Sequence, residues 1–571
     1  METISLSDEA PSASKPTNPL ARFVNWHYGN TKMVRTESEI ENDRRILCFA
    51  FQRWMLLPAA FLVQFALGSI HAWSVFNQPI DKHIFNDPHR NRAPNAYLIL
   101  IIFNGASACI MGPWLERHGP RSALAIGASL FAFGHLVTAL AIHVRQISLV
   151  YIGYGVLTGS GLGLSYISPV STLQKWFPDR RGFAAGFAVC GFGAGSMAFA
   201  KVPLPIMDAV GLPLTFVILG AVYFTIIISA SRVLRVPPPD FSIRGIDADG
   251  VAVDKYGATI EMQQEGEKNG GSSNDTNEKT AAVAEPTRIH YTLIESLSSR
   301  EYRLLYPAFL ANCLLGLVAI SRLSNMATDL FQVSREMGSN VVSGDGAFSI
   351  LGRIMFAWLS DSFGRKRSML LMMLTQIVCL VGMIFFAEYG HFWPFTIAIW
   401  VVTACFGGGF SVMPAMLTDL FGSKNVGGCH GVILTAWAIA GAAGGLIFTA
   451  IYDYLRTLGR SVSDPYIYNV NFYWVLAVCV TGLVIEFFLR ISVRDRLFPP
   501  VPGQITQFRV GTRILRISTT RGIEWLSRAV EDDEWYAYWE NRQPPLTSDT
   551  VPASMIREMA QQAKKTGQSP A

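Results

Sequence analysis

Residues 112–121 read GPWLERHGPR, and residues 357–366 read AWLSDSFGRK, at an offset of 245 positions. Each stretch closes one apolar run, places an acid and basic residues in a short turn, and leads into another apolar run. The same offset extends beyond the turns, because Pro169 recurs as Pro414. The chain is therefore built from two related halves, and parallel membrane repeats of this kind place a binding site at the bilayer midplane between them.

The composition excludes an ordinary soluble protein. The 571 residues are 50% hydrophobic and only 16% charged, a balance typical of a chain that lies in a bilayer. The formal net charge is +5, but Lys and Arg are concentrated in short turns and terminal segments, a pattern of membrane topology rather than of nucleic-acid binding. All cysteines but Cys48 fall within apolar runs, so we expect no disulfide framework. The polar N-terminal stretch shows no cleavable signal peptide.

Apolar runs that can cross about 30 Å of hydrocarbon, which takes about 20 helical residues, recur along both halves. All must be helices, because open strand edges in lipid would leave backbone groups unpaired. The predicted fold is all-α: a polytopic membrane protein of about twelve transmembrane helices in two pseudo-symmetric six-helix bundles. The expected spans are 54–76, 94–115, 122–143, 148–173, 183–207 and 212–234, then 304–330, 340–359, 368–388, 393–417, 429–452 and 472–489.

The spans divide the chain into five segments: an N-terminal tail (1–52), a first bundle (53–235), a linker (236–300), a second bundle (301–490) and a C-terminal tail (491–571). The linker contains GEKNGGSSNDTNEKT, which cannot bury enough apolar surface to fold, so we expect it to be disordered. Within the tail, residues 508–539 fit either an amphipathic helix on the inner leaflet or a loosely ordered segment. Basic residues in the short connections predict that both termini are cytoplasmic. We favour the plasma membrane.

Each repeated turn places an acid near basic residues in the connection between one helix and the next. We expect them to form a conformational latch between inward and outward opening, although basic residues that merely mark the cytoplasmic face are the simpler interpretation of either turn alone. The predicted latch residues are Glu116, Arg117, Arg121, Asp361, Arg365 and Lys366.

These turns resemble the signature of the major facilitator superfamily, from which the first copy departs by Glu116 in place of aspartate and Pro120 in place of a base. Residues 159–195, including the KWFPDRRG turn at 175–182, and LGSIHAWSVF at 67–76 resemble the oxalate/formate antiporter family, a relative of the monocarboxylate transporters. The resemblance covers residues 54–489. It implies a secondary transporter of small organic anions that rocks its two halves around a central site.

A positive charge within the eighth span is the main candidate for anion binding. Arg353 lies about two helical turns inward of Asp361, and an arginine at that depth costs about 2.5 kcal/mol or more if it faces lipid. We therefore expect it to face the bundle interior and to bind a carboxylate there. The family's anion-binding arginine matches this position. A structural ion pair between Arg353 and Asp345 is the alternative.

The family pattern fails in the eleventh span, where Trp437 stands in place of the lysine that oxalate transporters carry. Three explanations remain open: a monocarboxylate held by Arg353 alone, proton-coupled carriage, or a replacement cation. Arg322 is the candidate replacement, unless it pairs with Asp329 or extends outward to the interface.

Other cavity positions follow from the resemblance alone, and each has packing as its alternative. His71 could also couple proton movement to anion movement, because histidine titrates near neutral pH; a hydrogen-bonded structural role is the other interpretation. The positions that match are Gln64, His71, Tyr166, Phe406 and Phe410.

We predict a secondary active transporter of a small organic anion, either a monocarboxylate or a short dicarboxylate such as oxalate or formate, driven by antiport or proton symport. Its expected partners are that anion, protons and the lipid bilayer, with no nucleic acid. The alternative is a transporter-derived receptor that relays anion occupancy through the linker or tail. We expect no enzyme activity, cofactor or metal, because no nucleotide-binding, metal-ligand or nucleophile motif occurs in the spans.

Overall fold

A computed structural model describes residues 19–540 apart from 249–290 and short gaps at 30–32, 47–48, 88–89, 91, 240, 462, 493–495, 497–502 and 511–512. In this part of the chain, nine helical runs are long and apolar enough to cross a membrane. The protein is an integral multi-pass membrane protein, and the predicted all-α fold is confirmed.

The first half contains six spans. The helical run from Arg53 to Phe85 is the first, and the 50-residue helix α5 supplies two more because it bends sharply at Gly119. The elements are η1 (Arg53–Met55), α3 (Leu56–Leu67), η2 (Gly68–Trp73), α4 (Ser74–Phe85), α5 (Pro94–His143), α6 (Ile147–Val150), η3 (Tyr151–Thr158), α7 (Gly159–Trp176), α8 (Arg181–Phe199), α9 (Pro203–Val210) and α10 (Leu212–Ser231).

The second half repeats this arrangement. Two further helices of this half, α12 and α13, pack within the same bundle and complete the twelve spans. The elements are α11 (Leu293–Ser298), α12 (Arg300–Phe331), α13 (Arg335–Phe363), α14 (Arg365–Glu388), α15 (Phe392–Phe421), α16 (Val426–Thr457) and α17 (Pro465–Phe487).

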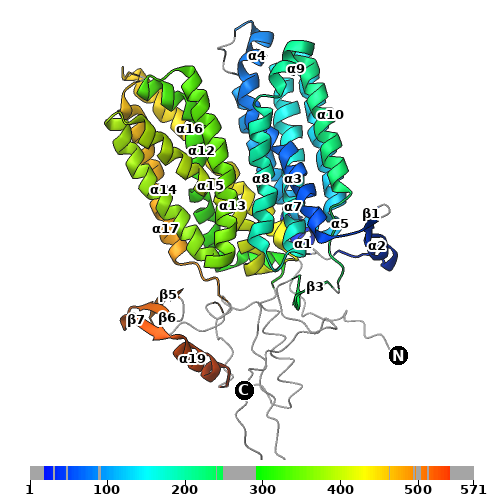
Figure 1. The fold of residues 1–571 in the computed structure, drawn as a ribbon, viewed down its shortest axis with the longest axis vertical. Coiled ribbons are helices and arrows are strands. Elements are labelled where there is room, and N and C mark those ends of the chain that lie inside the picture. The colour runs from blue at the N-terminus through cyan, green and yellow to red at the C-terminus, as the bar shows by residue number, and fades with distance from the viewer. Residues whose placement is uncertain are drawn as a thin grey trace, which may run out of the picture.

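Glycine breaks the helix at the equivalent point of each repeated turn. Gly119 has φ +79° and Gly364 has φ +96°, a backbone conformation that residues with a Cβ rarely adopt. The repeat in the sequence therefore corresponds to a repeated backbone break. The two bundles approach each other at the end near β3 and separate toward the end that bears α4 and α9 (Figure 1).

The terminal and linking segments contain more structure than the sequence indicated. The N-terminal tail holds α1 (Pro19–Gly29), α2 (Glu37–Asn42) and the pair β1 (Arg45–Ile46) and β2 (Phe49–Ala50). Within residues 236–300, where we expect disorder, the hairpin of β3 (Ser242–Ile243) and β4 (Ile246–Asp247) precedes residues 249–290, which lie outside the described chain, and α11 follows them. Thr292 and Glu295 form a capping box that starts α11, a signal visible in the sequence.

The amphipathic helix considered for residues 508–539 is wrong over the first part of that stretch. The chain forms an antiparallel sheet of β5 (Gln504–Val510), β6 (Arg513–Ser518) and β7 (Gly522–Ser527), followed by α19 (Arg528–Glu540). Burial alternates along β6, where Ile514 and Arg516 are buried and their neighbours are less so. This period of two is typical of a strand.

Candidate functional site

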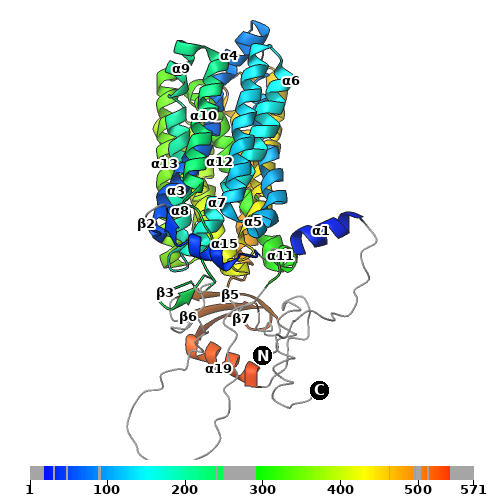
Figure 2. The ribbon, with the colours of Figure 1, turned by 90° about the vertical axis from the view of Figure 1, so that its right-hand side faces the viewer.

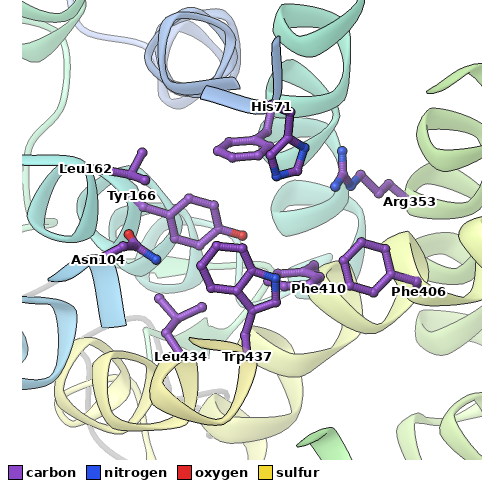
Figure 3. Close-up of a pocket in the computed structure, with 10 residues that line it drawn as sticks. His71, Asn104, Leu162, Tyr166, Arg353, Phe406, Phe410, Leu434 and Trp437 are labelled. Carbon is purple, nitrogen blue, oxygen red and sulfur yellow. The ribbon is translucent and has the colours of Figure 1, made fainter. Parts of the chain in front are cut away.

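A cavity lies between the two halves and is lined by residues from both (Figure 3). The first half supplies side chains from η2, α5, α7 and α8, and the second half supplies side chains from α13, α15 and α16. The lining residues are His71, Asn104, Leu162, Tyr166, Phe192, Arg353, Phe406, Phe410, Leu434 and Trp437.

Arg353 supplies a guanidinium to this cavity, and the residue is only 4% exposed. Its Nε and Nη1 atoms have no hydrogen-bond partner among the described residues, and it forms no ion pair with Asp345 within them. A Cβ at position 193 would lie 2.7 Å from Nη1, so the glycine on α8 leaves room for the guanidinium. Buried N–H donors without an acceptor are costly. The arrangement therefore calls for an acceptor that enters the cavity, such as a carboxylate or water.

His71 lies opposite Arg353. Figure 3 shows the imidazole and the guanidinium pointing into the same space, and the hydroxyl of Tyr166 points inward below them. The Nε2 atom of His71 has no partner among the described residues, and its ring meets the ring of Phe192 edge-on at 4.9 Å between centroids. The imidazole of His71 is thus a second polar group that faces the cavity without a partner for its Nε2 among the described residues.

Most of the remaining wall is apolar, and much of it is aromatic. The ring centroids of Phe406 and Phe410 lie 5.3 Å apart, and those of Phe410 and Trp437 lie 6.2 Å apart in an edge-on arrangement. Tyr166 meets Phe192 edge-on at 5.8 Å. Within the described part of the chain, the lining thus offers one guanidinium and a largely apolar wall, which fits a ligand with one carboxylate and a small apolar remainder.

The structure brings together most of the predicted binding residues. Gln64 lies behind the cavity, where its Nε2 donates to the backbone carbonyl of Tyr166 at 3.1 Å. Arg322 falls within α12, but its side chain lies outside what the structure describes. The predicted residues that line the cavity are Arg353, Tyr166, His71, Phe406, Phe410 and Trp437.

Four lining residues were not predicted from the sequence. Asn104 offered a signal, since it is a lone amide within the apolar run YLILIIFNGA. Leu162, Phe192 and Leu434 offered none, because apolar side chains in an apolar span look alike whether they face lipid, a neighbouring helix or a cavity.

Glu116 and Asp361, the acids of the two repeated turns, each bind the backbone of the opposite half. Glu116 accepts a hydrogen bond from the N–H of Gly427 on α16 at 2.7 Å and is paired with Lys175. Asp361 accepts from the N–H groups of Gly182, at 3.0 Å, and Phe183, at 2.8 Å, at the start of α8. The two contacts are equivalent under the repeat, and each fixes an acid at a helix N-terminus.

Arg365 extends the second contact into an ionic network. It donates to Asp361 at 2.6 Å and to Asp419 at 3.0 Å. Asp419 also accepts from Arg181 of the first half at 2.6 Å. Arg181 and Asp419 were not among the predicted latch residues, although Arg181 belongs to the KWFPDRRG turn.

The contacts described for the other predicted latch residues lie within their own half or its adjoining segments. Arg117 donates to the backbone carbonyl of His27 at 2.7 Å, and Arg121 binds Asp43 at 2.7 Å. Lys366 donates to the carbonyls of Phe487, at 2.9 Å, and Leu489, at 2.6 Å. These three bases hold local structure around the turns.

Two bundles of related topology around a shared central cavity, joined at one end by ionic contacts, are the architecture of secondary transporters. The chain belongs to the Major Facilitator Superfamily, whose family model matches residues 46–322 and 305–530.

Among curated proteins, the chain is 28% identical to the uncharacterized MFS-type transporter YhjX of Escherichia coli (strain K12) over 389 residues, covering 68% of this chain and 85% of that relative. It is 22% identical to the oxalate:formate antiporter of Oxalobacter formigenes over 456 residues, covering 79% and 94%. Among solved structures, the human organic anion transporter MFSD10 (TETRAN) superposes with a TM-score of 0.52 at 13% identity, covering 76% of this chain and 99% of that one.

Proposed function

We propose that this chain is a secondary active transporter of small organic anions that works by alternating access. The observation that carries the proposal is Arg353, a buried guanidinium with two unpartnered N–H groups in a cavity to which both halves contribute. The similarity to the oxalate:formate antiporter of Oxalobacter formigenes supports the same class of substrate.

A monocarboxylate is the substrate that fits best. Among the lining residues that the structure describes, Arg353 is the one Lys or Arg, and Trp437 presents an indole where a second cation would hold a dianion. Aromatic rings form a large part of the cavity wall and suit a short apolar remainder. The flux is driven by antiport of another anion or by proton symport, with His71 as the titratable group that faces the cation.

The latch and the topology complete the proposal. Glu116, Asp361 and Arg365 hold the linker end closed in the described conformation, and their release permits the halves to rock. The positive-inside pattern of the short connections supports a cytoplasmic location for that end and for both chain termini. We propose the plasma membrane as the location.

Counterflow of labelled formate, lactate, pyruvate and oxalate into proteoliposomes at two pH values tests the proposal. We expect exchange of monocarboxylates in preference to oxalate, and a rise in uptake toward acid pH if protons are coupled. Anion binding without flux would instead identify a receptor and would contradict the proposal.

Arg353→Lys tests the assigned residue, since it keeps the charge but loses the planar pair of donors. The apparent affinity for the transported acid should fall about 10- to 100-fold, because hydrogen bonds to charged groups contribute about 1.5–3 kcal/mol. Lys201→Arg, a swap outside the cavity lining on an exposed residue, is the control. Unchanged transport by Arg353→Lys would remove that residue from the site.

A further inference from the structure

The sheet of β5, β6 and β7 has two unlike faces. One face is covered by α19: Arg516 donates to Glu534 at 2.7 Å, and Gln507 donates to Glu531 at 2.9 Å. Because side chains alternate along a strand, the neighbours of these residues point to the opposite face. We call that opposite face the outer face. Its described side chains are Thr506, Phe508, Arg513, Leu515, Ile517, Ile523, Trp525 and Ser527.

The register makes the outer face continuous and apolar. Phe508 pairs with Leu515, and Leu515 pairs with Trp525 on the next strand. At the far edge, Ile523 is 69% exposed and Trp525 is 58% exposed. Two large apolar side chains exposed side by side on one strand mark an interaction surface.

The outer face meets the membrane-spanning bundle at its other edge. The ring centroid of Phe508 lies 4.4 Å from that of Phe487, the last residue of α17. The Nζ atom of Lys366 lies 4.4 Å from the centroid of the Phe508 ring, and Thr506 donates to the carbonyl of Phe487 at 3.4 Å. Since α17 spans the membrane, the outer face begins where a transmembrane helix ends.

The placement of the sheet directs the outer face toward the bilayer. Figure 2 shows the sheet between the helical bundle and α19, so that α19 covers the side away from the membrane. The strand order is β5-β6-β7, and Figure 1 shows β7 farther than β5 from the axis between the two bundles. Strand β7, which carries the exposed Ile523 and Trp525, is therefore the strand of the sheet farthest from that axis.

The charges follow the same division. The outer face carries Arg513 and no acid among its described side chains, and Arg521 lies in the turn between β6 and β7. One acid of this segment, Glu524 of β7, lies on the α19 side of the sheet and is 3.9 Å from Arg521. The other described acids lie on α19, on that same side, and are Glu531, Asp532, Asp533 and Glu534. A basic, apolar face toward the lipid and an acidic helix away from it complement an anionic leaflet.

We propose that the outer face of the β5–β7 sheet docks on the anionic leaflet at the linker end of the bundle, with Trp525 and Ile523 inserted at the level of the lipid head groups. Tryptophan is enriched at this depth because its ring is apolar and its N–H is polar. Arg513 and Arg521 bind lipid phosphates beside it. The bilayer thereby holds the sheet against Phe487 and Lys366.

The test uses the full chain in vesicles of phosphatidylcholine with or without phosphatidylserine. An environment-sensitive fluorophore is attached at Ile523→Cys, and in a matched variant at Val530→Cys, which is 42% exposed on α19. Parent protein treated with the same reagent corrects for the native thiols. We expect doxyl-labelled lipid to quench the fluorophore at position 523 and not at 530, and aqueous iodide to do the reverse.

The charge component is tested by Arg513→Gln in the Ile523→Cys chain. One basic residue near an anionic surface contributes about 1 kcal/mol, so the ratio of docked to undocked sheet should fall about fivefold in vesicles that contain phosphatidylserine. Equal iodide quenching at 523 and 530 would overturn the proposal. Protection of position 523 from both quenchers would also overturn it, because protein and not lipid would then cover the face. Quenching by doxyl lipid that ignores phosphatidylserine would overturn the anionic preference.

Discussion

Trp437 is the residue that underlies our proposal of a singly charged substrate. Its indole is 4% exposed and packs against Phe410 at the wall that also contains Arg353. A lysine at this position would bring a second cation to bear on a ligand held by Arg353.

We predict that Trp437→Lys shifts preference from monocarboxylates toward oxalate. A charge-assisted hydrogen bond of about 1.5–3 kcal/mol corresponds to a change of about 10- to 100-fold in the ratio of oxalate to formate transport. Competition counterflow in proteoliposomes measures that ratio. Trp437→Leu, which removes the ring without adding charge, is the control, and an identical ratio for the two variants would contradict the prediction.

Asp179 illustrates a residue whose charge stabilises the fold outside the spans. Burial alone raises the pKa of its carboxyl, but the hydrogen bonds and charge of Arg53 outweigh that effect and hold the pKa below its ordinary value. Arg53 donates to both carboxylate oxygens, at 2.8 Å and 3.2 Å. The pair ties the start of the first span to the connection between α7 and α8.

We predict that Asp179→Asn destabilises the protein at neutral pH by about 1.5–3 kcal/mol. Because the folded-state pKa is depressed, this stabilisation is complete above the unfolded value of about 3.9 and is lost as the pH falls through the folded value. Thermal unfolding of parent and variant in detergent, from neutral pH into the acid range, should therefore show two curves that converge only in acid. A constant difference between them would show that the carboxylate charge is not responsible.

Charged and polar residues gave the clearest sequence evidence for the position of the site. Arg353 was predictable because a guanidinium inside an apolar span has few tolerable surroundings. Phe192 and Leu434 were not, because which face of an apolar helix meets a cavity depends on packing between helices distant in the chain. The two amide donors of α8 and the one of α16 that meet the latch acids were equally invisible, since they belong to the backbone.

At the scale of elements, the contacts of the proposed latch depend on two glycines that allow close approach. A Cβ at position 182 would lie 2.6 Å from Oδ1 of Asp361, and a Cβ at position 427 would collide with Oε1 of Glu116. Each glycine is the second residue of a helix of one half and lies where the acid of the other half makes its contact.

We predict that Gly182→Ala and Gly427→Ala separate the helices at the linker end and shift the protein toward the conformation open on that side. Spin-label distances between the two halves, measured near the linker end, should lengthen in both variants. Gly445→Ala is the control, since a Cβ there meets nothing within 4 Å on the same helix, α16. Distances unchanged in Gly182→Ala and Gly427→Ala would show that the acids do not hold this end closed.

The elements themselves were predicted unevenly. The repeated turns at offset 245 indicated the spans and their division, and the break at Gly119 falls between the expected spans 94–115 and 122–143. Residues 513–518 were misread because Arg513 and Arg516 are mixed there with Ile and Leu, and their spacing of three positions also suits an amphipathic helix. The buried ion pair of Arg516 with Glu534, which makes a strand possible, joins residues on different elements.

On the scale of the whole molecule, the halves are held together by contacts that lie outside the linker. Helix α5 packs against α16, and α8 packs against α13. Arg181 and Asp419 add an ionic bond across the same boundary at 2.6 Å.

We predict that the chain works when split. Residues 1–248 and 291–571, expressed together, should copurify and transport at a rate similar to that of the intact chain. Arg181→Gln in the first fragment should weaken copurification, whereas Arg460→Gln, which removes an exposed pair with Asp464, should not. Fragments that fail to associate would assign the pairing of the halves to the linker.

Substitutions affect the two sides of the contact between the bundles unequally. Carboxylates on one side are received by peptide N–H groups on the other, and every residue except proline supplies such a group. A single substitution can remove the carboxylate of Asp361 or Glu116. At position 183, any residue other than proline keeps the N–H group that donates to Asp361. Substitutions that alter these contacts therefore act on the acids and on the two glycines, because the N–H groups that the acids contact belong to the main chain.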